Sequence, residues 1–277
     1  FELLDGFVTY GHCVTGAEMM DRMPNLRIIS NFGVGVDHID LEAAKMRGIP
    51  VGNTPNVLDG AVADMTFALL MAAARNIVIG DKYARGPEFI HYDPSLLLGV
   101  EIHGSTLGII GMGNIGREVA RRARGFDMRI LYHNRNRNLR AEDELDVSYR
   151  SLDEILSESD YIVLNVPLAP ETHHMIGRAE LQQIRPTAIL VNMARGGVVD
   201  HDALLEALEN RWIAAAALDV TEPEPLPREH PLLQMENLVI APHLGSATIQ
   251  TRRAMAQLTV DNLMAGLAGE PLTKRIV

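Results

Sequence analysis

The central part of the chain alternates short apolar runs with segments of helical periodicity. The apolar runs predict strands at residues 106–110, 129–132, 161–165, 188–192, 214–219 and 238–241. Helical patterns follow at residues 114–124, 178–183 and 202–210, and Ser151-Leu-Asp-Glu154 has the spacing of a capping box that opens a further helix. This alternation predicts an α/β fold, with a doubly wound parallel sheet covered by helices on both faces.

Two flanking regions predict a second, smaller α/β unit. Strands are expected at residues 26–30 and 51–53, around a helix at residues 41–47. Residues 59–75 predict a long helix, and 248–266 a tail helix that returns to the N-terminal part. The apolar face of the long helix carries Val62, Met65, Thr66, Leu69, Leu70 and Ala73. We therefore expect one domain from residues 1–56 and 248–277 and another from residues 57–247. Within the second domain, Gly125 is expected to end the helix at residues 114–124.

Composition narrows the classes of function. The 277 residues carry a formal net charge of −11, which argues against a general surface for nucleic acid or anionic membrane. No apolar run approaches the roughly 20 residues that a membrane span requires. A single cysteine, Cys13, excludes an internal disulfide and fits a reducing compartment, so we expect a cytoplasmic protein with a small-molecule substrate.

A glycine-rich loop follows the strand at residues 106–110 and opens the helix at 114–124. It reads Gly111-Met-Gly113-Asn114-Ile115-Gly116, which matches G-x-G-x-x-G in the strand–loop–helix setting of a Rossmann dinucleotide site. Gly111 permits the tight turn, Gly113 lets a pyrophosphate approach the backbone, and Gly116 allows close helix–strand packing. The free amides of the helix N-terminus then face the phosphates, so we predict a nicotinamide dinucleotide.

The choice between NAD and NADP is made near the end of the second strand of such a domain. An acidic side chain there accepts the ribose 2′-hydroxyl of NAD. This chain instead reads Tyr132-His-Asn134-Arg135-Asn-Arg137, without Asp or Glu. Arg135, with Asn134 beside it, would pair with a 2′-phosphate, so NADP(H) is favoured and NAD(H) stays possible. The alternative is a solvated basic loop.

Three ionisable residues follow the carboxyl ends of successive predicted strands. Arg195, Glu224 and His243 would therefore lie along the sheet edge where α/β proteins bind ligands. His243 would supply the proton in carbonyl reduction, Glu224 would stabilise its imidazolium, and Arg195 would bind a substrate carboxylate. Taken singly, each also fits a structural role, and Glu222 is a rival for Glu224. His173 and His174 are adjacent but lack further ligand spacing, so no metal is predicted.

Six ordered segments of the chain resemble the D-2-hydroxyacid dehydrogenase family, over nearly its whole length. They are Asn31-Phe-Gly-Val-Gly-Val-Asp37, Asn53-Thr-Pro, the glycine loop, Asn192-Met-Ala-Arg-Gly-Gly197, Leu218-Asp-Val-Thr-Glu-Pro-Glu-Pro225 and Pro242-His-Leu-Gly-Ser-Ala247. By this resemblance Arg195, Glu224 and His243 match the catalytic Arg, Glu and His, and the backbone amides of Val34 and Gly35 bind the substrate carboxylate. The positions that match cofactor-lining ones are Val166, Pro167, Met193, Ala194, Asp219 and Gly245.

Within the family, the chain looks most like the NADPH-preferring glyoxylate/hydroxypyruvate reductases and their 2-ketogluconate reductase relatives. The resemblance implies a flavodoxin-like substrate domain that here lacks its opening strand and first helix, and a homodimer. Residues 86–99, where substrate-facing positions differ among members, carry no readable pattern.

The function expected is NADPH-dependent reduction of a small 2-keto acid to the D-2-hydroxy acid. Three alternatives stay open: an NAD-dependent dehydrogenase of another specificity, a non-enzymatic corepressor-like sensor of the same fold, and a methyltransferase that binds S-adenosylmethionine at the glycine loop.

Overall fold

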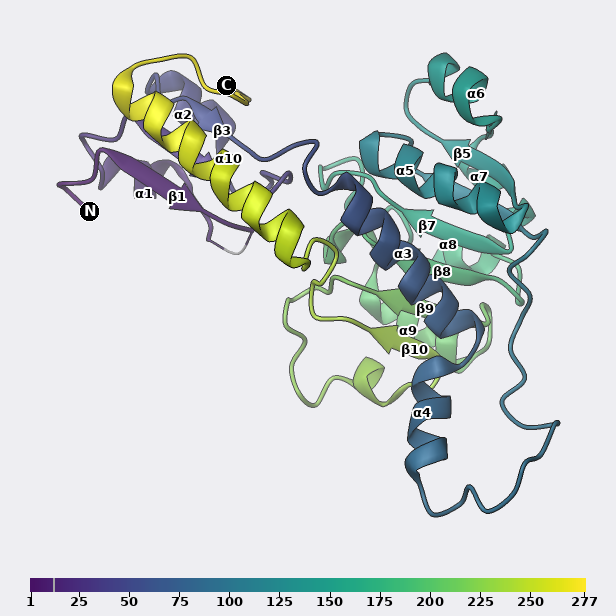
Figure 1. Ribbon diagram of the computed structural model, residues 1–277. Coiled ribbons are helices and arrows are strands. Elements are labelled where there is room, and N and C mark those ends of the chain that lie inside the picture. The colour runs from purple at the N-terminus through teal and green to yellow at the C-terminus, as the bar shows by residue number, and fades with distance from the viewer. Residues whose placement is uncertain (12) are drawn as a thin grey trace. The chain divides into compact units, whose positions relative to one another are not determined.

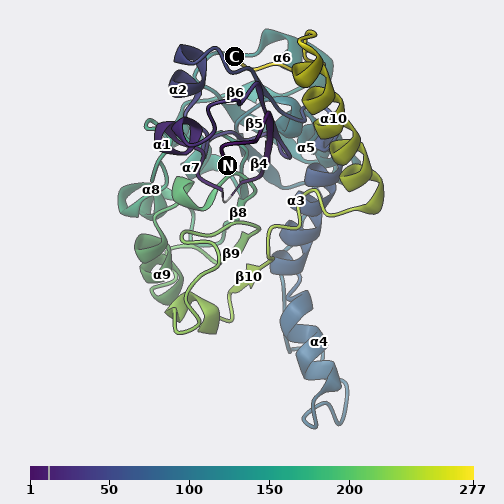
Figure 2. The same cartoon turned by 90° about the vertical axis from the view of Figure 1, so that its left-hand side faces the viewer.

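The computed structural model describes residues 1–11 and 13–277. The chain forms two compact units (Figures 1 and 2). Phe1–Ala61 and Ser246–Val277 make the first unit, and Val62–Gly245 makes the second. The tail thus joins the N-terminal residues, and the second unit is one continuous stretch of chain.

The second unit is built on a seven-stranded parallel sheet with the order β10-β9-β8-β7-β4-β5-β6. Its strands are β4 (Thr106–Ile110), β5 (Arg129–His133), β6 (Ser148–Tyr149), β7 (Tyr161–Leu164), β8 (Ile189–Asn192), β9 (Ala215–Leu218) and β10 (Leu238–Ile240). Strand order reverses between β4 and β7, and such a switch point is where ligands bind in open α/β sheets.

Helices cover both faces of this sheet, which explains why its strands read as apolar runs without alternation. On one face, α7 (Leu152–Glu158), α8 (Arg178–Gln183) and α9 (His201–Glu209) bury a continuous cluster of aliphatic side chains. The other elements are α5 (Asn114–Ala123), η1 (Arg124–Phe126), α6 (Leu139–Leu145), η2 (Gly196–Val198) and η3 (Pro231–Gln234). Helix α7 begins with the predicted capping box, in which Ser151 and Glu154 exchange hydrogen bonds.

The predicted strands of this sheet are all present, within one residue at either end, and the doubly wound fold is confirmed. Two details differ. The seventh strand, β6, has only two residues, too few for a periodic pattern. The prediction that Gly125 ends the first crossover helix is wrong: α5 ends at Ala123, and the left-handed residue is Asp127, with φ of 52°. Aspartate tolerates that conformation because its short polar side chain forms local hydrogen bonds.

The long helix α3 (Asp59–Ala74) is buried on more than the single face expected from the sequence, because Ala63, Phe67 and Ala74 are buried as well, whereas Met65 is only half-buried. Phe67 stacks on Phe126 at 5.3 Å between ring centroids. Helix α4 (Ile77–Arg85) follows α3 and has no buried residue. Among the described residues no single helix is long and apolar enough to cross a membrane; α3 and α4, bent by 60°, meet the length and composition criteria only as a pair.

The first unit is a three-stranded parallel sheet with the order β1-β2-β3. Its elements are β1 (Gly6–Thr9), α1 (Ala17–Asp21), β2 (Ile28–Asn31), α2 (Leu41–Met46), β3 (Val51–Gly52) and α10 (Ile249–Ala268). Helix α10 packs on the sheet so closely that a Cβ on Gly266 would lie 2.5 Å from Ile28, and Ser30 donates from its hydroxyl to the carbonyl of Thr259 at 2.8 Å. Strand β1 has four residues and helix α1 has five, too few for a periodic pattern, which explains why the sequence did not predict them.

Candidate functional site

The glycine loop has the geometry of a phosphate-binding turn. Gly111 has φ of 105°, and a Cβ there would lie 2.7 Å from the carbonyl of Asn165. A Cβ on Gly116 would meet the Gly111 carbonyl oxygen at 2.2 Å, so α5 packs against the loop at a distance only glycine allows. Gly113, the N-cap of α5, has nothing within 4 Å of its Cβ position and no side-chain cap. Open space therefore lies at the helix N-terminus, where an anion is favoured.

Asn165, which the sequence did not single out, adjoins this turn at the end of β7. Among the described residues, neither its side-chain nitrogen nor its side-chain oxygen has a hydrogen-bond partner, although both atoms are buried. A buried amide without partners costs about 1–3 kcal/mol, so such groups usually face a bound ligand or water. Together with the open space at Gly113, this unpartnered amide fits a dinucleotide.

The loop after β5 is held in place by side chains that the sequence did not connect. The amide of Met112 donates to Oδ1 of Asn134 at 2.7 Å, and Nδ2 of Asn138 donates to the Met112 carbonyl at 3.1 Å. Asn134 therefore supports the glycine loop through its carbonyl oxygen. Arg135 is exposed and makes no hydrogen bond or ion pair within the described part of the chain.

Arg137 is engaged, in contrast to Arg135. It donates two hydrogen bonds to Glu142 on α6, at 2.7 and 2.6 Å, and the hydroxyl of Tyr132 donates to the same carboxylate at 2.6 Å. Hydrogen bonds from Arg137, and to a smaller extent from Tyr132, lower the pKa of Glu142 to about 2. Burial, with the neighbouring Glu142, raises the pKa of Tyr132 to about 12. Glu142 is thus an acidic neighbour of the cofactor loop that the sequence missed, and its charge is already paired.

The strand ends that carry the predicted site lie side by side along one edge. The first residue after each of these strands donates a hydrogen bond from its backbone amide to the last carbonyl of the adjacent strand. The pairs are Asn165 to Ile110 at 2.8 Å, Asp219 to Asn192 at 3.0 Å and Ala241 to Leu218 at 2.8 Å. Met193 likewise donates to Leu164, at 3.2 Å. Val166 begins the loop that approaches Gly111, and Pro167 accepts a hydrogen bond from Thr172. Met193 and Ala194 are buried.

Glu224 and His243 come together at this edge. Nδ1 of His243 lies 2.7 Å from Oε1 of Glu224, and because a carboxylate only accepts, Nδ1 carries the proton of this hydrogen bond. The other Glu224 oxygen accepts from the amide of Thr221 at 3.3 Å. His243 has φ of 56° and its amide donates to the Asp219 carbonyl at 2.9 Å. A left-handed residue costs on the order of 1–3 kcal/mol, and such strain is typical of functional sites.

Asp219 fixes the loop that follows His243. Its two carboxylate oxygens accept from the amides of Leu244 and Gly245, at 2.7 and 2.8 Å. Burial raises the pKa of Asp219, and these two amides oppose that rise. A Cβ on Gly245 would lie 2.9 Å from Oδ2 of Asp219, so the approach requires glycine.

Arg195 lies on the adjoining loop, after β8. Its guanidinium donates to the Ala194 carbonyl at 2.9 Å, and its own carbonyl accepts from the side chain of Asn192 at 2.8 Å. A Cβ on Gly196, the next residue, would lie 2.1 Å from the carbonyl of Thr221. The loop of Arg195 therefore packs directly against the loop of Glu224.

The predicted carboxylate loop belongs to the first unit. Nδ2 of Asn31 donates to the carbonyls of Gly33 and Gly35, at 3.0 and 2.9 Å, and Nδ2 of Asn53 donates to the carbonyl of Val34 at 2.9 Å. The carbonyl oxygens are therefore occupied by asparagine side chains, while the amides of Val34 and Gly35 have no acceptor in the described residues. Such a run of free amides is suited to an anion.

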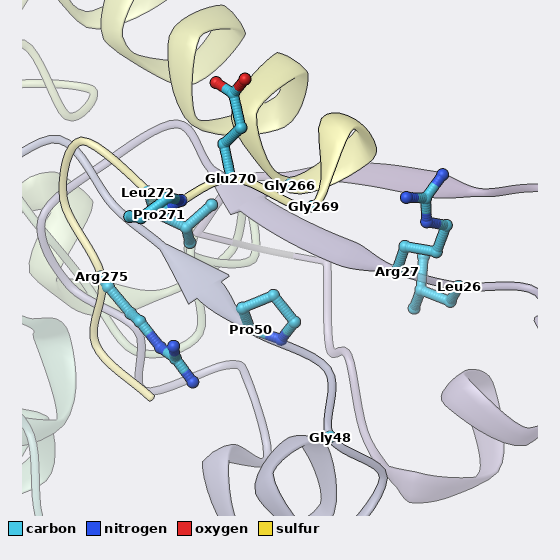
Figure 3. A pocket seen from close by; sticks show the side chains of 10 residues that line it. All are labelled: Leu26, Arg27, Gly48, Pro50, Gly266, Gly269, Glu270, Pro271, Leu272 and Arg275. Atoms are coloured by element: carbon cyan, nitrogen blue, oxygen red, sulfur yellow. The ribbon is translucent and has the colours of Figure 1, made fainter.

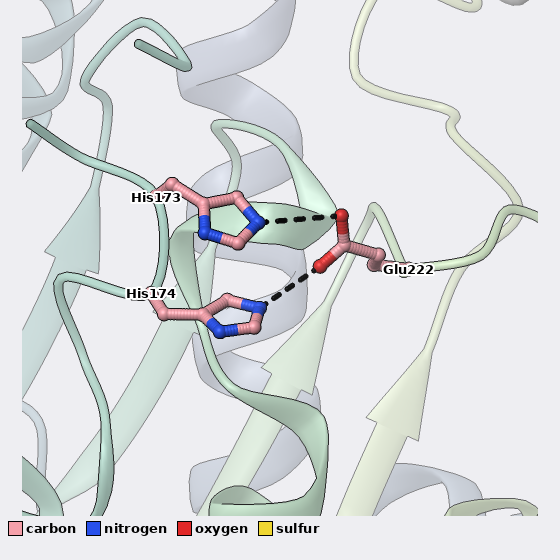
Figure 4. A group of neighbouring side chains, drawn as sticks. All are labelled: His173, His174 and Glu222. Atoms are coloured by element: carbon pink, nitrogen blue, oxygen red, sulfur yellow. Dashed lines mark hydrogen bonds and ion pairs between the residues drawn. The ribbon is translucent and has the colours of Figure 1, made fainter. Parts of the chain in front are cut away.

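Glu222, the rival for Glu224, has two histidines as its neighbours. Its carboxylate faces His173 and His174 (Figure 4), with 3.0 Å to Nε2 of His174 and 3.8 Å to Nε2 of His173. The structure therefore assigns the two glutamates of this loop to different neighbours.

A surface hollow of about 430 Å³ lies in the first unit, between the end of α10 and the turn before β3 (Figure 3). It is lined by Leu26, Arg27, Gly48, Pro50, Gly266, Gly269, Glu270, Pro271, Leu272 and Arg275. None of the predicted site residues lines it, so the hollow is separate from the chemistry described above.

Comparisons with known proteins agree with this geometry. Residues 67–245 match the family model described as D-isomer specific 2-hydroxyacid dehydrogenase, NAD binding domain. A glyoxylate reductase of Pyrococcus furiosus is 51% identical over 257 residues, covering 91% of this chain and 76% of that protein. A crystal structure of a Thermus thermophilus protein superposes with a TM-score of 0.94 at 46% identity, over 100% of this chain and 87% of the other.

A third relative was solved with ligands. The NADPH-dependent glyoxylate/hydroxypyruvate reductase of Sinorhizobium meliloti, in complex with NADP and malonate, has a TM-score of 0.92 at 34% identity, over 100% of this chain and 85% of that chain. With the glycine loop, the strand-end residues and these matches in agreement, the chain belongs to the D-isomer specific 2-hydroxyacid dehydrogenases, oxidoreductases that use a nicotinamide dinucleotide.

Proposed function

We propose that the protein reduces a small 2-keto acid, of the glyoxylate, hydroxypyruvate or 2-ketogluconate type, to the D-2-hydroxy acid with NADPH. The observation that carries this proposal is the contact between His243 and Glu224, 2.7 Å long, at the sheet edge that also holds the glycine loop. The family match and the glyoxylate reductase relatives support the substrate class.

The proton and charge movements of the reduction fall to three side chains of this edge. His243 presents Nε2 to the substrate and donates its proton to the oxygen as the alcohol forms. Glu224 keeps the ring oriented through Nδ1 and stabilises the positive charge that the ring carries before transfer. Arg195 is proposed to bind the carboxylate and polarise the keto group, and the amides of Val34 and Gly35 to hold the carboxylate.

The bound dinucleotide supplies the hydride. The chain's contribution is to bind it: the amides at Gly113, Asn114 and Ile115 would hold the phosphates, and Gly111 and Gly116 shape the turn. The remaining lining positions proposed are Val166, Pro167, Met193, Ala194, Asp219 and Gly245. We propose that Arg135 pairs with the 2′-phosphate of NADPH and that the amide nitrogen of Asn134 assists it. The uncommitted state of Arg135 supports this choice over Arg137.

The test is an oxidation assay for reduced cofactor with the purified protein. Glyoxylate, hydroxypyruvate and 2-ketogluconate are each supplied with NADPH and then with NADH. Turnover of at least one keto acid with a higher kcat/KM for NADPH is expected, and the product should be the D enantiomer where it is chiral. Tight NADPH binding without turnover of any keto acid would instead favour a dinucleotide sensor. A higher kcat/KM for NADH than for NADPH would contradict the proposed role of Arg135.

We also propose that the protein is a homodimer. The apolar face of α3 is buried within the chain, so we expect the contact elsewhere. The exposed apolar surface lies in residues 77–100, where nine large apolar side chains are exposed: Ile77, Val78, Phe89, Ile90, Tyr92, Leu96, Leu97, Leu98 and Val100. This segment, the arm, projects from the second unit (Figures 1 and 2). Its base is closed by the Val100 amide, which donates to the Ala74 carbonyl at 2.9 Å.

Exposed apolar surface of this extent is uncommon on a monomer and marks an interaction site. A second copy of the chain is the partner that is always present, and a two-fold pairing would bury both arms with one self-complementary contact.

A further inference from the structure

Two histidines and one glutamate converge on one point of the second unit. His173 and His174 follow β7, and their rings stack with centroids 3.9 Å apart (Figure 4). Glu222 comes from the loop after β9. The ligand atoms of all three lie within 4.8 Å of one another. No sequence pattern predicted a metal here, because the third donor is 48 residues away from the histidine pair.

The spacing of these atoms suits a single small cation. Two ligands of a tetrahedral Zn²⁺, with bonds of about 2.0–2.1 Å, lie about 3.3 Å apart. Oε2 of Glu222 lies 3.0 Å from Nε2 of His174, and Oε1 of Glu222 lies 3.8 Å from Nε2 of His173, on either side of that value. Small rotations of three surface side chains would therefore complete the geometry.

Backbone hydrogen bonds fix the position of the two histidines, and a glycine leaves room for the carboxylate. The His173 amide donates to the Ala169 carbonyl at 2.9 Å, and the His174 amide donates to the Gly197 carbonyl at 2.7 Å. A Cβ on Gly197 would lie 2.9 Å from Oε1 of Glu222, so the absence of a side chain at Gly197 leaves room for the carboxylate. A preformed set of ligands reduces the ordering that an ion must otherwise impose.

The donor set selects the class of ion. Two imidazole nitrogens with one carboxylate are the protein ligands of many catalytic zinc sites and leave one position open, whereas Mg²⁺ and Ca²⁺ prefer oxygen ligands throughout. The side chains are 50%, 41% and 43% exposed, so an ion can enter directly from solvent.

We propose that His173, His174 and Glu222 form a binding site for a divalent transition-metal ion of the Zn²⁺ class. The ion would join the loop after β7 to the loop after β9, two residues before Glu224. The site does not depend on the keto acid or the cofactor that the protein uses, so its test stands apart from the proposed reaction.

The experiment is a calorimetric titration of the whole protein with Zn²⁺, paired with a Co²⁺ titration followed by visible absorption. The protein carries no polyhistidine tag and has Cys13→Ser as background, which removes the one thiol that would compete for the ion. His174→Ala and Glu222→Gln remove one ligand each. His103→Ala, which removes an exposed histidine paired with Asp127 outside the cluster, is the matched control.

We expect one Zn²⁺ per chain, a Co²⁺ spectrum of four-coordinate type, and a Tm that rises with Zn²⁺. His174→Ala and Glu222→Gln should each weaken binding by about tenfold or more, since loss of an outer-shell partner alone costs 10–100-fold. His103→Ala, and also His243→Ala, should bind Zn²⁺ as the background protein does. Circular dichroism checks that each variant is folded. No saturable binding, or binding that survives loss of His174 and Glu222, would overturn the proposal.

Discussion

At His243 one imidazole nitrogen, Nδ1, is committed to Glu224. The left-handed backbone of His243 and the hydrogen bond from its amide to Asp219 set the direction of the ring. The sequence placed both residues at the same sheet edge because each follows the carboxyl end of a strand. It favoured Glu224 over Glu222, which sits closer to the strand and before the first proline. It did not predict the neighbours of Glu222, since these depend on loop geometry that no periodic pattern encodes.

Replacing Glu224 tests the pair directly. Glu224→Gln keeps an acceptor oxygen near Nδ1 but removes the charge that stabilises the imidazolium. We expect kcat for keto acid reduction to fall by at least about 10-fold, with little change in cofactor affinity. Steady-state kinetics check this, with Glu229→Gln, an exposed glutamate further along the same loop, as control. Equal loss of rate in both variants would contradict the assignment.

Asp219 provides a pH-dependent test. Burial raises its folded-state pKa above the ordinary value of 3.8, so the folded protein holds this proton more tightly than the unfolded chain. The associated stability is fully present below pH 3.8 and is lost as the pH rises through the folded pKa. The wild type should therefore gain stability relative to Asp219→Asn as the pH falls through that range. Urea unfolding at a series of pH values measures the difference, and a pH-independent difference would contradict the shifted pKa.

At the scale of elements, the loop between β5 and α6 shows what sequence patterns miss. The strand and its basic residues were predictable from an apolar run followed by Arg135 and Arg137. Helix α6 was not, because it is short and mostly polar, and so the pairing of Arg137 with Glu142 was hidden. Strand β6 was not predictable either, because it is an edge strand of only two residues. The glycine loop was predictable because its spacing, strand and helix lie within one short segment.

Cofactor choice is a property of this loop. Arg135→Ala should raise KM for NADPH by about 10- to 100-fold, because a charge-assisted hydrogen bond contributes roughly 1.5–3 kcal/mol. KM for NADH should change little. Arg140→Ala removes an equally basic but paired side chain on α6 and should leave both values as they are. The prediction fails if Arg135→Ala weakens NADH and NADPH alike.

At the scale of the whole molecule, two α/β units and their order along the chain were predictable from the alternation of strands and helices. The arm was not, because residues 86–99 have no secondary-structure period and their large apolar side chains are exposed. The cluster of His173, His174 and Glu222 was equally hidden, since its members are brought together only by the order of the strands. Contacts over short sequence distances and residues at strand ends were therefore readable, whereas the arm and this cluster were not.

The arm gives a prediction for assembly. Ile90→Glu, at a side chain that is 81% exposed, should convert a dimer into a monomer because a charge would be buried without a partner in the interface. Met46→Glu, at 78% exposure on the first unit, should leave the dimer intact. Sedimentation or light scattering measures the mass of each. A monomeric wild type, or a dimer unaffected by Ile90→Glu, would contradict the role of the arm.

The most direct test of the proposed reaction is the rate of NADPH oxidation by glyoxylate, measured side by side for the wild type and His243→Ala. The account predicts turnover by the wild type and a kcat about 10²–10⁴-fold lower in the variant, with NADPH affinity retained, because only the proton donor is lost. A variant that turns over at the wild-type rate would contradict the role of His243.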